Sequence, residues 1–239
     1  KYIFGLSFAA IMMLAVSASA GTKYWSGGGT WGVDSRWATS SGGTYDQPWT
    51  AGDNAVFEGT PGAVAVSGTI SVSNITFTAS SSGYAISGGT LAFAAGATID
   101  HAVKNMKHTI ASAITGDPAV NIVNSSTYEG LVFAPSAGSQ SLGLCTVPYE
   151  DVGQNGDKGG IELGGTTSGN VAAEITFIMG AYPGNKYATL WKTGAGTWTI
   201  GNLHIGTVRL QAGRLVANGT SWVTEYGQFA FTGGALAGT

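Results

Sequence analysis

The sequence predicts an all-β protein of the β-solenoid type, in which the chain winds into stacked coils of short parallel strands. The chain of 239 residues contains 39 glycines, whereas an average protein has about 7% glycine. These glycines flank short segments in which Val, Ile, Leu and Phe alternate with other residues, as in Ser87–Phe93 and Gln211–Ala217. Such segments are typical of short strands joined by tight turns.

A loose repeat of about 20 residues favours a solenoid over other all-β folds. Related apolar positions recur at this spacing in the pairs Val66 and Ile86, Leu91 and Ile110, and Leu215 and Leu236. The alternative is an antiparallel β-sandwich, which shows the same alternation. Strands of three to five residues with Gly-Gly-Thr corners suit solenoid rungs better than sandwich strands. We therefore expect a solenoid over residues 63–239, with a loop insertion around residues 146–160.

Residues 1–20 are typical of a secretory signal peptide. Lys1 provides the positive flank, residues 3–16 are apolar, and Ala18-Ser19-Ala20 fits the small-x-small cleavage pattern. An uncleaved anchor is the alternative, but the apolar run is shorter than the ~20 residues that span a bilayer. We expect a cleaved, secreted protein with no later membrane span.

The charge distribution argues against nucleic acid as a partner. The expected mature chain has nine Lys and Arg against 13 Asp and Glu, a net charge of −4. Charged residues make up only 10% of the sequence. No basic stripe is present of the kind that phosphate contacts require.

A tryptophan-rich region occupies residues 21–62, before the regular alternation begins. Trp25, Trp31 and Trp37 are six residues apart, an even spacing that can place them on one face of an extended chain. A solenoid needs a cap over its first coil, because that coil exposes apolar side chains and unpaired backbone groups. We therefore expect an aromatic-rich N-terminal cap. The alternative is a sugar-stacking site formed by the same three indoles.

One loop matches the spacing of a calcium-binding loop. Asp151, Asn155, Asp157 and Glu162 are its candidate ligands, and Gly156 stands at the sixth position, where the chain must turn sharply. However, Gly153 occupies the third position, where a calcium loop carries Asp or Asn, and no flanking helices are evident. We expect a polar surface loop, with calcium as the alternative and no other cofactor.

The remaining reactive residues do not suggest an enzyme. Acid–base catalysis needs clustered carboxylates, but the acids are scattered along the chain. Asp100 and His101 are adjacent, so strand alternation places their side chains on opposite faces. Cys145 is the single cysteine and cannot form an intrachain disulfide. We expect it to be a small buried residue.

Two stretches resemble the autotransporter-associated β-strand repeat proteins of bacteria. Trp191-Lys-Thr-Gly-Ala-Gly-Thr-Trp-Thr-Ile200 with Ala212-Gly-Arg-Leu-Val-Ala-Asn-Gly219 is similar to the repeat itself. Asn74-Ile-Thr-Phe77 and the following segment to Phe93 resemble the first coils. Arg214 stands where the repeat usually has Thr. The resemblance implies a right-handed parallel β-helix at the bacterial cell surface, with a structural or export role.

We therefore expect a secreted or cell-surface structural protein: a stalk, a surface-layer component or a self-assembling filament subunit. Self-association would occur end to end or by strand donation at an open final rung. A carbohydrate-binding adhesin is the first alternative, with a surface polysaccharide as its partner. A polysaccharide lyase or hydrolase of the β-helix type is the second.

Overall fold

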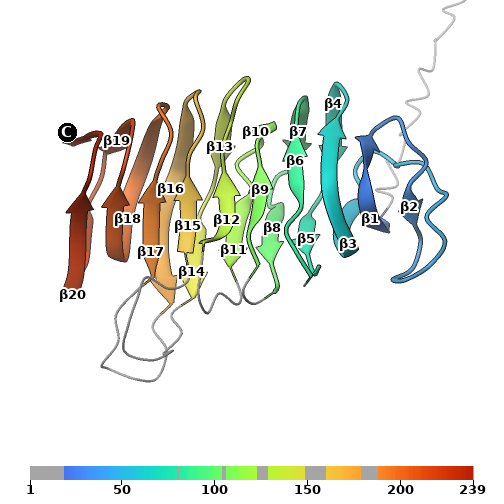
Figure 1. Ribbon diagram of the computed structural model, residues 1–239, viewed down its shortest axis with the longest axis horizontal. Coiled ribbons are helices and arrows are strands. Elements are labelled where there is room, and N and C mark those ends of the chain that lie inside the picture. Colours follow the sequence, from blue (N-terminus) through green and yellow to red (C-terminus); the bar gives the residue numbers. More distant parts are fainter. Residues whose placement is uncertain are drawn as a thin grey trace, which may run out of the picture.

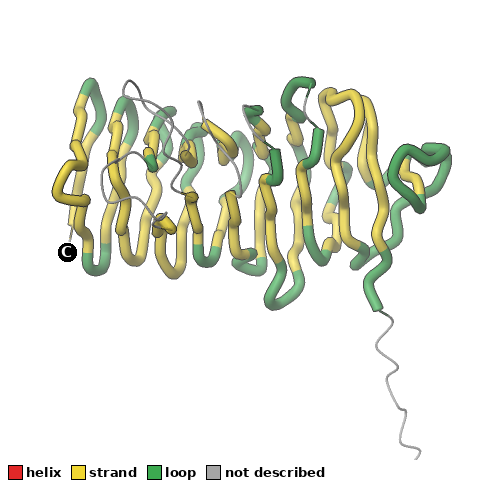
Figure 2. The backbone as a smooth tube through the Cα atoms, turned by 90° about the horizontal axis from the view of Figure 1, so that it is seen from below, coloured by secondary structure: helices red, strands yellow, loops and turns green. Residues whose placement is uncertain are grey.

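The structure, a computed structural model, describes residues 19–79, 81–103, 106–122, 129–148, 160–178 and 188–238. Within these ranges the chain has no helix and folds into 21 strands that follow one another along the long axis (Figures 1 and 2). Neighbouring coils pair in parallel, and among the described residues only β1 with β2, and Trp37 with Gln47, pair antiparallel. The predicted parallel β-helix is confirmed, and the sandwich alternative is wrong.

Each complete coil contributes one strand segment to each of three parallel stacks. Successive coils contribute these strands to the first stack: β1 (Thr22–Trp31), β3 (Asn54–Val66), β5 (Ile75–Phe77), β8 (Thr98–His101), β11 (Ala119–Ile122), β14 (Cys145–Pro148), β16 (Gly169–Ile178), β18 (Thr197–Leu210) and β20 (Ser221–Phe231).

The second stack combines the later parts of β1, β3, β18 and β20 with five shorter strands. These are β6 (Ala85–Ser87), β9 (His108–Ile110), β12 (Glu129–Phe133), β15 (Gly160–Leu163) and β17 (Thr189–Lys192).

The third stack begins one coil later and includes the first parts of β16 and β18. Its other strands are β4 (Thr69–Val72), β7 (Thr90–Phe93), β10 (Ala113–Thr115), β13 (Gln140–Leu142), β19 (Arg214–Ala217) and β21 (Ala235–Gly238). We number the coils from β1, so that β8, β9 and β10 form the fourth coil.

Alternating side chains from the three stacks fill the interior of the coils. In β4, Ile70 and Val72 are buried while Thr69 and Ser71 are exposed. The buried positions join into one apolar column along the rod. Continuous hydrogen-bonded ladders join neighbouring coils. The apolar column adds to their stability, because burial of apolar surface stabilises the folded state by about 25 cal/mol per Å².

The repeat length varies because each coil differs in its loops. In the first stack Ile75 lies beside Ile99, 24 residues later, whereas Cys145 lies beside Ile175, 30 residues later. Leu215 and Leu236 lie beside each other in neighbouring coils, as their spacing in the sequence predicts. Leu91, however, lies beside Ile114 and not beside Ile110, and Ile86 lies beside Val64 and not beside Val66.

Glycines occupy one corner of the later coils because each coil passes close to the one before. Gly165, Gly194 and Gly213 have φ values of +84°, +64° and +67°. A Cβ on Gly194 would lie 2.3 Å from the carbonyl oxygen of Gly165, and one on Gly213 would lie 2.4 Å from that of Gly194. The corner therefore requires glycine for both its backbone conformation and its contact with the preceding coil.

The solenoid begins before the expected boundary at residue 63. β1 pairs in parallel with β3 from Thr22 to Trp31, so β1 is already part of the first coil. The cap proper is the excursion between β1 and β3, which contains β2 (Trp37–Ala38) at the end of the rod (Figure 1).

Candidate functional site

The three tryptophans of the predicted sugar-stacking site lie inside the cap. Trp25, Trp31 and Trp37 are each 0% exposed. The ring centroid of Trp37 lies 5.0 Å from that of Trp25, 5.1 Å from that of Trp31 and 4.6 Å from that of Trp49. An indole without an exposed face cannot stack on a sugar. The burial therefore argues against the stacking site and favours the cap.

The cap also satisfies the backbone of the first coil. β2 pairs with the start of β1, opposite Tyr24 and Trp25. Further along β1, the Thr30 amide donates to the Asp34 carboxylate at 2.6 Å, and the Thr30 carbonyl accepts from the amides of Val33 and Asp34. The cap thus covers the apolar rings of the first coil and pairs part of the β1 edge that would recruit another strand, while the indole N–H groups of Trp31 and Trp37 are buried without a hydrogen-bond partner.

An aromatic run continues from the cap into the column. Phe57 lies 5.4 Å from Phe77, and Phe77 stacks on His108 at 4.5 Å. Tyr84 packs edge-on against Phe57, and its hydroxyl bonds the carbonyl of Glu58 at 2.5 Å. Burial raises the pKa of Tyr84 to about 12, so this side chain is neutral across the physiological range.

The loop with the calcium-like spacing, expected to be a polar surface loop, is only partly described. Asp151, Asn155 and Asp157 lie outside the described residues. Glu162, in β15, accepts a hydrogen bond from Thr193 Oγ1 at 2.6 Å and pairs with Lys107 Nζ at 3.0 Å. These two contacts occupy its carboxylate oxygens, so Glu162 acts here as a link between coils.

Other titratable groups in the described chain also form local contacts. The Asp100 carboxylate accepts hydrogen bonds from Asn121 at 2.8 Å and from Thr98 at 2.9 Å, on the outer face of the first stack. His101, the next residue, is fully buried, as alternation predicts. Glu174 pairs with His204 at 2.5 Å. Among the described residues, no three His, Cys, Asp or Glu side chains are grouped to hold a metal ion.

Cys145 lies in the column, as the sequence predicts. It is 0% exposed, and burial strongly raises the pKa of its thiol. The thiolate is the nucleophilic form of cysteine. A buried thiol of this kind therefore acts as a small apolar residue.

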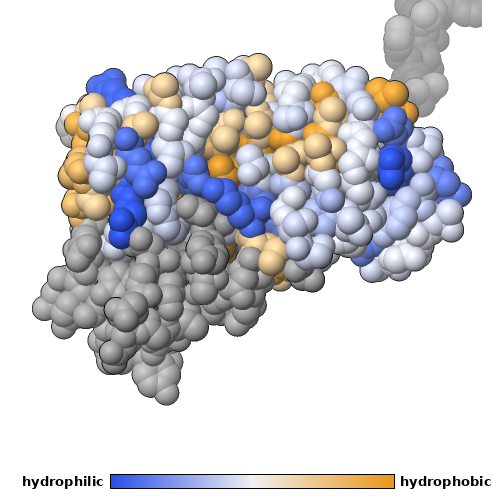
Figure 3. Space-filling view, viewed as in Figure 1, coloured by the Kyte–Doolittle hydropathy of each residue, from blue (hydrophilic) through white to orange (hydrophobic). Residues whose placement is uncertain are grey.

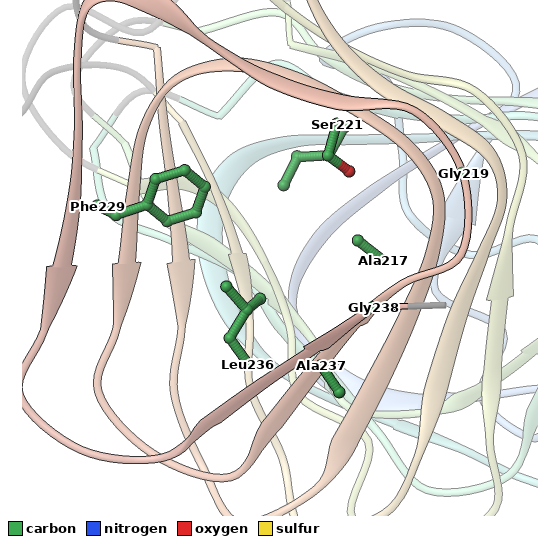
Figure 4. A pocket seen from close by; sticks show the side chains of 8 residues that line it. Ala217, Gly219, Ser221, Phe229, Leu236, Ala237 and Gly238 are labelled. Atoms are coloured by element: carbon green, nitrogen blue, oxygen red, sulfur yellow. The ribbon is translucent and has the colours of Figure 1, made fainter.

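At the other end of the described coils, apolar side chains are partly exposed. Phe229, Phe231 and Leu236 belong to the last coil and are 44%, 54% and 45% exposed. Figure 3 shows hydrophobic surface at this end, and Figure 4 shows Phe229 and Leu236 projecting into the space enclosed by the final coils. A depression of about 440 Å³ opens here, lined by Leu203, Ala217, Gly219, Ser221, Phe229, Leu236, Ala237 and Gly238.

Sequence reasoning missed Lys192 as an inward residue. It is fully buried in the second stack, between Leu163 and Leu210 in register. Its ammonium donates to the carbonyls of Thr193, Gly194 and Ala212, at 2.5, 3.0 and 3.1 Å. Burial lowers its pKa to about 8, and Glu162 partly opposes that shift. The sequence feature that could have drawn attention to Lys192 is its place near the start of the segment Trp191–Ile200, which is similar to the β-strand repeat.

Comparison with known proteins gave no further assignment. No family model, no curated protein and no solved structure matches the chain. In the described part of the chain, no helix has the length and apolar character needed to cross a membrane.

Proposed function

We propose that this protein is a secreted or cell-surface structural β-solenoid, which serves as a stalk, a surface-layer component or a subunit of a larger assembly. One observation carries the proposal: the described coils stack into a rod with one continuous apolar column inside and polar side chains on its outer faces. The cap shields the indoles and part of the backbone edge of the first coil, whereas the last coil leaves Phe229, Phe231 and Leu236 partly in water.

The interior of the rod supports a structural role. Its buried positions are mostly apolar and form one continuous column. Polar side chains on the outer face of the first stack link neighbouring coils, as when Asn74 Nδ2 donates to Asn54 Oδ1 at 2.7 Å. The resemblance of residues 190–219 to a repeat of secreted bacterial proteins supports a location at the cell surface.

The two ends also restrict how copies of the rod can associate. A head-to-tail stack would require the cap to move away from β1, because β2 and the Thr30–Asp34 turn already cover part of that edge. Two last coils, by contrast, can meet about a two-fold axis, so that the same surface is used twice. In the described chain no strand pairs with the outer edge of β20 or β21. Residues 21–239 on their own are therefore expected to associate through their last coils.

The expected result is a dimer in solution that depends on the last coil. Size-exclusion chromatography with light scattering of residues 21–239 should give twice the monomer mass. Phe231→Lys should give the monomer, because an ammonium replaces the apolar surface that would be buried against a second copy. Val33→Lys is the matched control: Val33 is 68% exposed at the cap end, and its replacement should leave the dimer intact.

A strictly monomeric protein at all concentrations would contradict self-association through the last coil. So would an equal loss of association in Phe231→Lys and Val33→Lys. Circular dichroism of each variant checks that the β-structure is retained.

A carbohydrate-binding adhesin is the second candidate. The sugar-stacking site that the sequence suggested for it is not accessible, since Trp25, Trp31 and Trp37 are buried. The adhesin would require a different sugar-binding surface, and a glycan array tests it directly. The enzyme alternative is tested by release of reducing or unsaturated sugar from a panel of plant and algal polymers.

A further inference from the structure

Two histidines interrupt the apolar column in the fourth coil. His101 ends β8 and His108 begins β9, and both are 0% exposed. Their ring centroids lie 5.2 Å apart at an interplanar angle of 63°. The first and second stacks thus each contribute one imidazole to the same part of the interior.

The hydrogen bonds of the two rings define their neutral tautomers. His101 Nε2 lies 2.9 Å from the Met106 carbonyl oxygen, which can only accept, so Nε2 carries the proton and Nδ1 is a bare acceptor. His108 Nδ1 accepts from the Tyr84 amide at 2.9 Å, so its proton is on Nε2. The other nitrogen of each ring, His101 Nδ1 and His108 Nε2, is buried without a hydrogen-bond partner.

The described surroundings offer a positive charge only backbone carbonyl oxygens, among them those of Met106 and Ala79, and no carboxylate. Phe77 and Tyr84 stack on His108, and Gly130 lies beside the Nδ1 edge of His101. Tyr84 is the one other titratable side chain against the pair among the described residues, and it is neutral. Among the described side chains, the charged groups next to the two histidines in sequence are engaged elsewhere: Asp100 with Asn121 and Thr98, and Lys107 with Glu162.

We propose that the His101–His108 pair makes the fourth coil an acid-sensitive joint in the rod. Both rings fit the column only when neutral, because a buried charge without a charged partner is strongly disfavoured. A proton on either ring places that charge in the column, 5.2 Å from the second imidazole. Mild acid therefore opens β8 and β9 before the rest of the rod.

The direction of the pH dependence follows from the shifted pKa values. Burial lowers the pKa of both histidines below 6.5, and that of His108 to about 3, with a further contribution from His101. Between these values the unfolded chain binds more protons than the folded one. Stability is therefore fully present above pH 6.5 and falls as the pH drops, by about tenfold in the folding equilibrium constant per pH unit for His108 down to about pH 3, and in the same direction for His101.

Hydrogen exchange at pH 7.0 and pH 4.5, corrected for the intrinsic rate, tests the proposal on the unmodified chain. Amides of β8 and β9 and of their neighbours β5, β6, β11 and β12 should lose protection at pH 4.5, while those of β18 keep theirs. A uniform loss along the rod would overturn the proposal. So would nitrogen-15 NMR titrations in which both histidines of the folded protein protonate near pH 6.5.

Two variants each remove one of the two histidines. In each, the new side chain is of the same type as the residue beside that histidine in a neighbouring coil. His101→Phe extends the column from Phe77, its neighbour in β5, and His108→Leu matches Leu131, its neighbour in β12. His108→Leu should reduce the loss of stability between pH 6.5 and pH 4.5 by at least tenfold in the folding equilibrium constant, and His101→Phe should reduce it in the same direction.

Ile99→Val, in the same strand β8, is the control for these variants. It removes one buried methyl group without changing any titration, so it should lower stability equally at both pH values. An unchanged pH dependence in both histidine variants would contradict the joint.

Discussion

Replacing Gly194 by alanine should destabilise the protein by about 3 to 4 kcal/mol, which lowers the melting temperature by roughly 10 °C in a chain of this length. Two costs combine at this corner. A left-handed backbone conformation costs a residue with a Cβ about 1–2 kcal/mol. The new Cβ would also lie 2.3 Å from the carbonyl oxygen of Gly165, and overpacking of this kind costs about 1–3 kcal/mol.

Gly96→Ala provides the matched control for this prediction. Gly96 has a similar φ of +77°, but a Cβ there meets nothing within 4 Å. Its replacement should cost only the conformational term, about 1–2 kcal/mol. The difference between the two variants measures the contact between stacked coils. Equal thermal shifts in Gly194→Ala and Gly96→Ala would show that the coils do not approach each other at this corner.

Trp37→Ala should remove the cap, with a loss of about 3–5 kcal/mol, as for other buried aromatic residues replaced by alanine. Trp37 is the ring that contacts Trp25, Trp31, Trp49 and Phe57 together. Without it, water reaches the first coil and the edge of β1 loses the packing that holds β2. Denaturant titration followed by tryptophan fluorescence measures the loss.

Trp37→Phe is the conservative comparison, since it keeps an aromatic ring in the cap and should cost less than half as much. The exposed first coil of Trp37→Ala should also associate with the first coil of another copy, which light scattering would detect as growth beyond the dimer. A Trp37→Ala variant as stable as the unmodified protein would contradict the capping role.

The sequence predicts the architecture well because alternation and glycine corners are local signals. Thr69–Val72, Arg214–Ala217 and Gly160–Leu163 are strands with the bounds that their alternation indicates. The register between coils is not local, since it depends on loops whose length changes from coil to coil. For this reason the spacing correctly predicts that Leu215 lies beside Leu236 in the next coil. It wrongly predicts Ile110, and not Ile114, as the neighbour of Leu91.

The polar residues of the interior were harder to predict. His101, His108 and Lys192 point inward, and each makes hydrogen bonds to backbone groups. Their partners lie on loops and neighbouring coils, so the alternation of apolar residues along a strand does not indicate them. Trp25, Trp31 and Trp37 carried two interpretations in the sequence, and only their burial distinguishes a cap from a sugar-binding face.

Distances between spin labels along one stack test the parallel arrangement most directly. Thr69 faces outward in β4, and successive coils place Thr197, Arg214 and Ala235 five, six and seven steps away in register. With a strand spacing of about 4.8 Å, labels at Thr69 and each of these sites should be separated by about 24, 29 and 34 Å. Distances that rise by one strand spacing per coil are the predicted result. Distances that fail to rise from Thr197 to Arg214 to Ala235 would contradict a rod of stacked parallel coils.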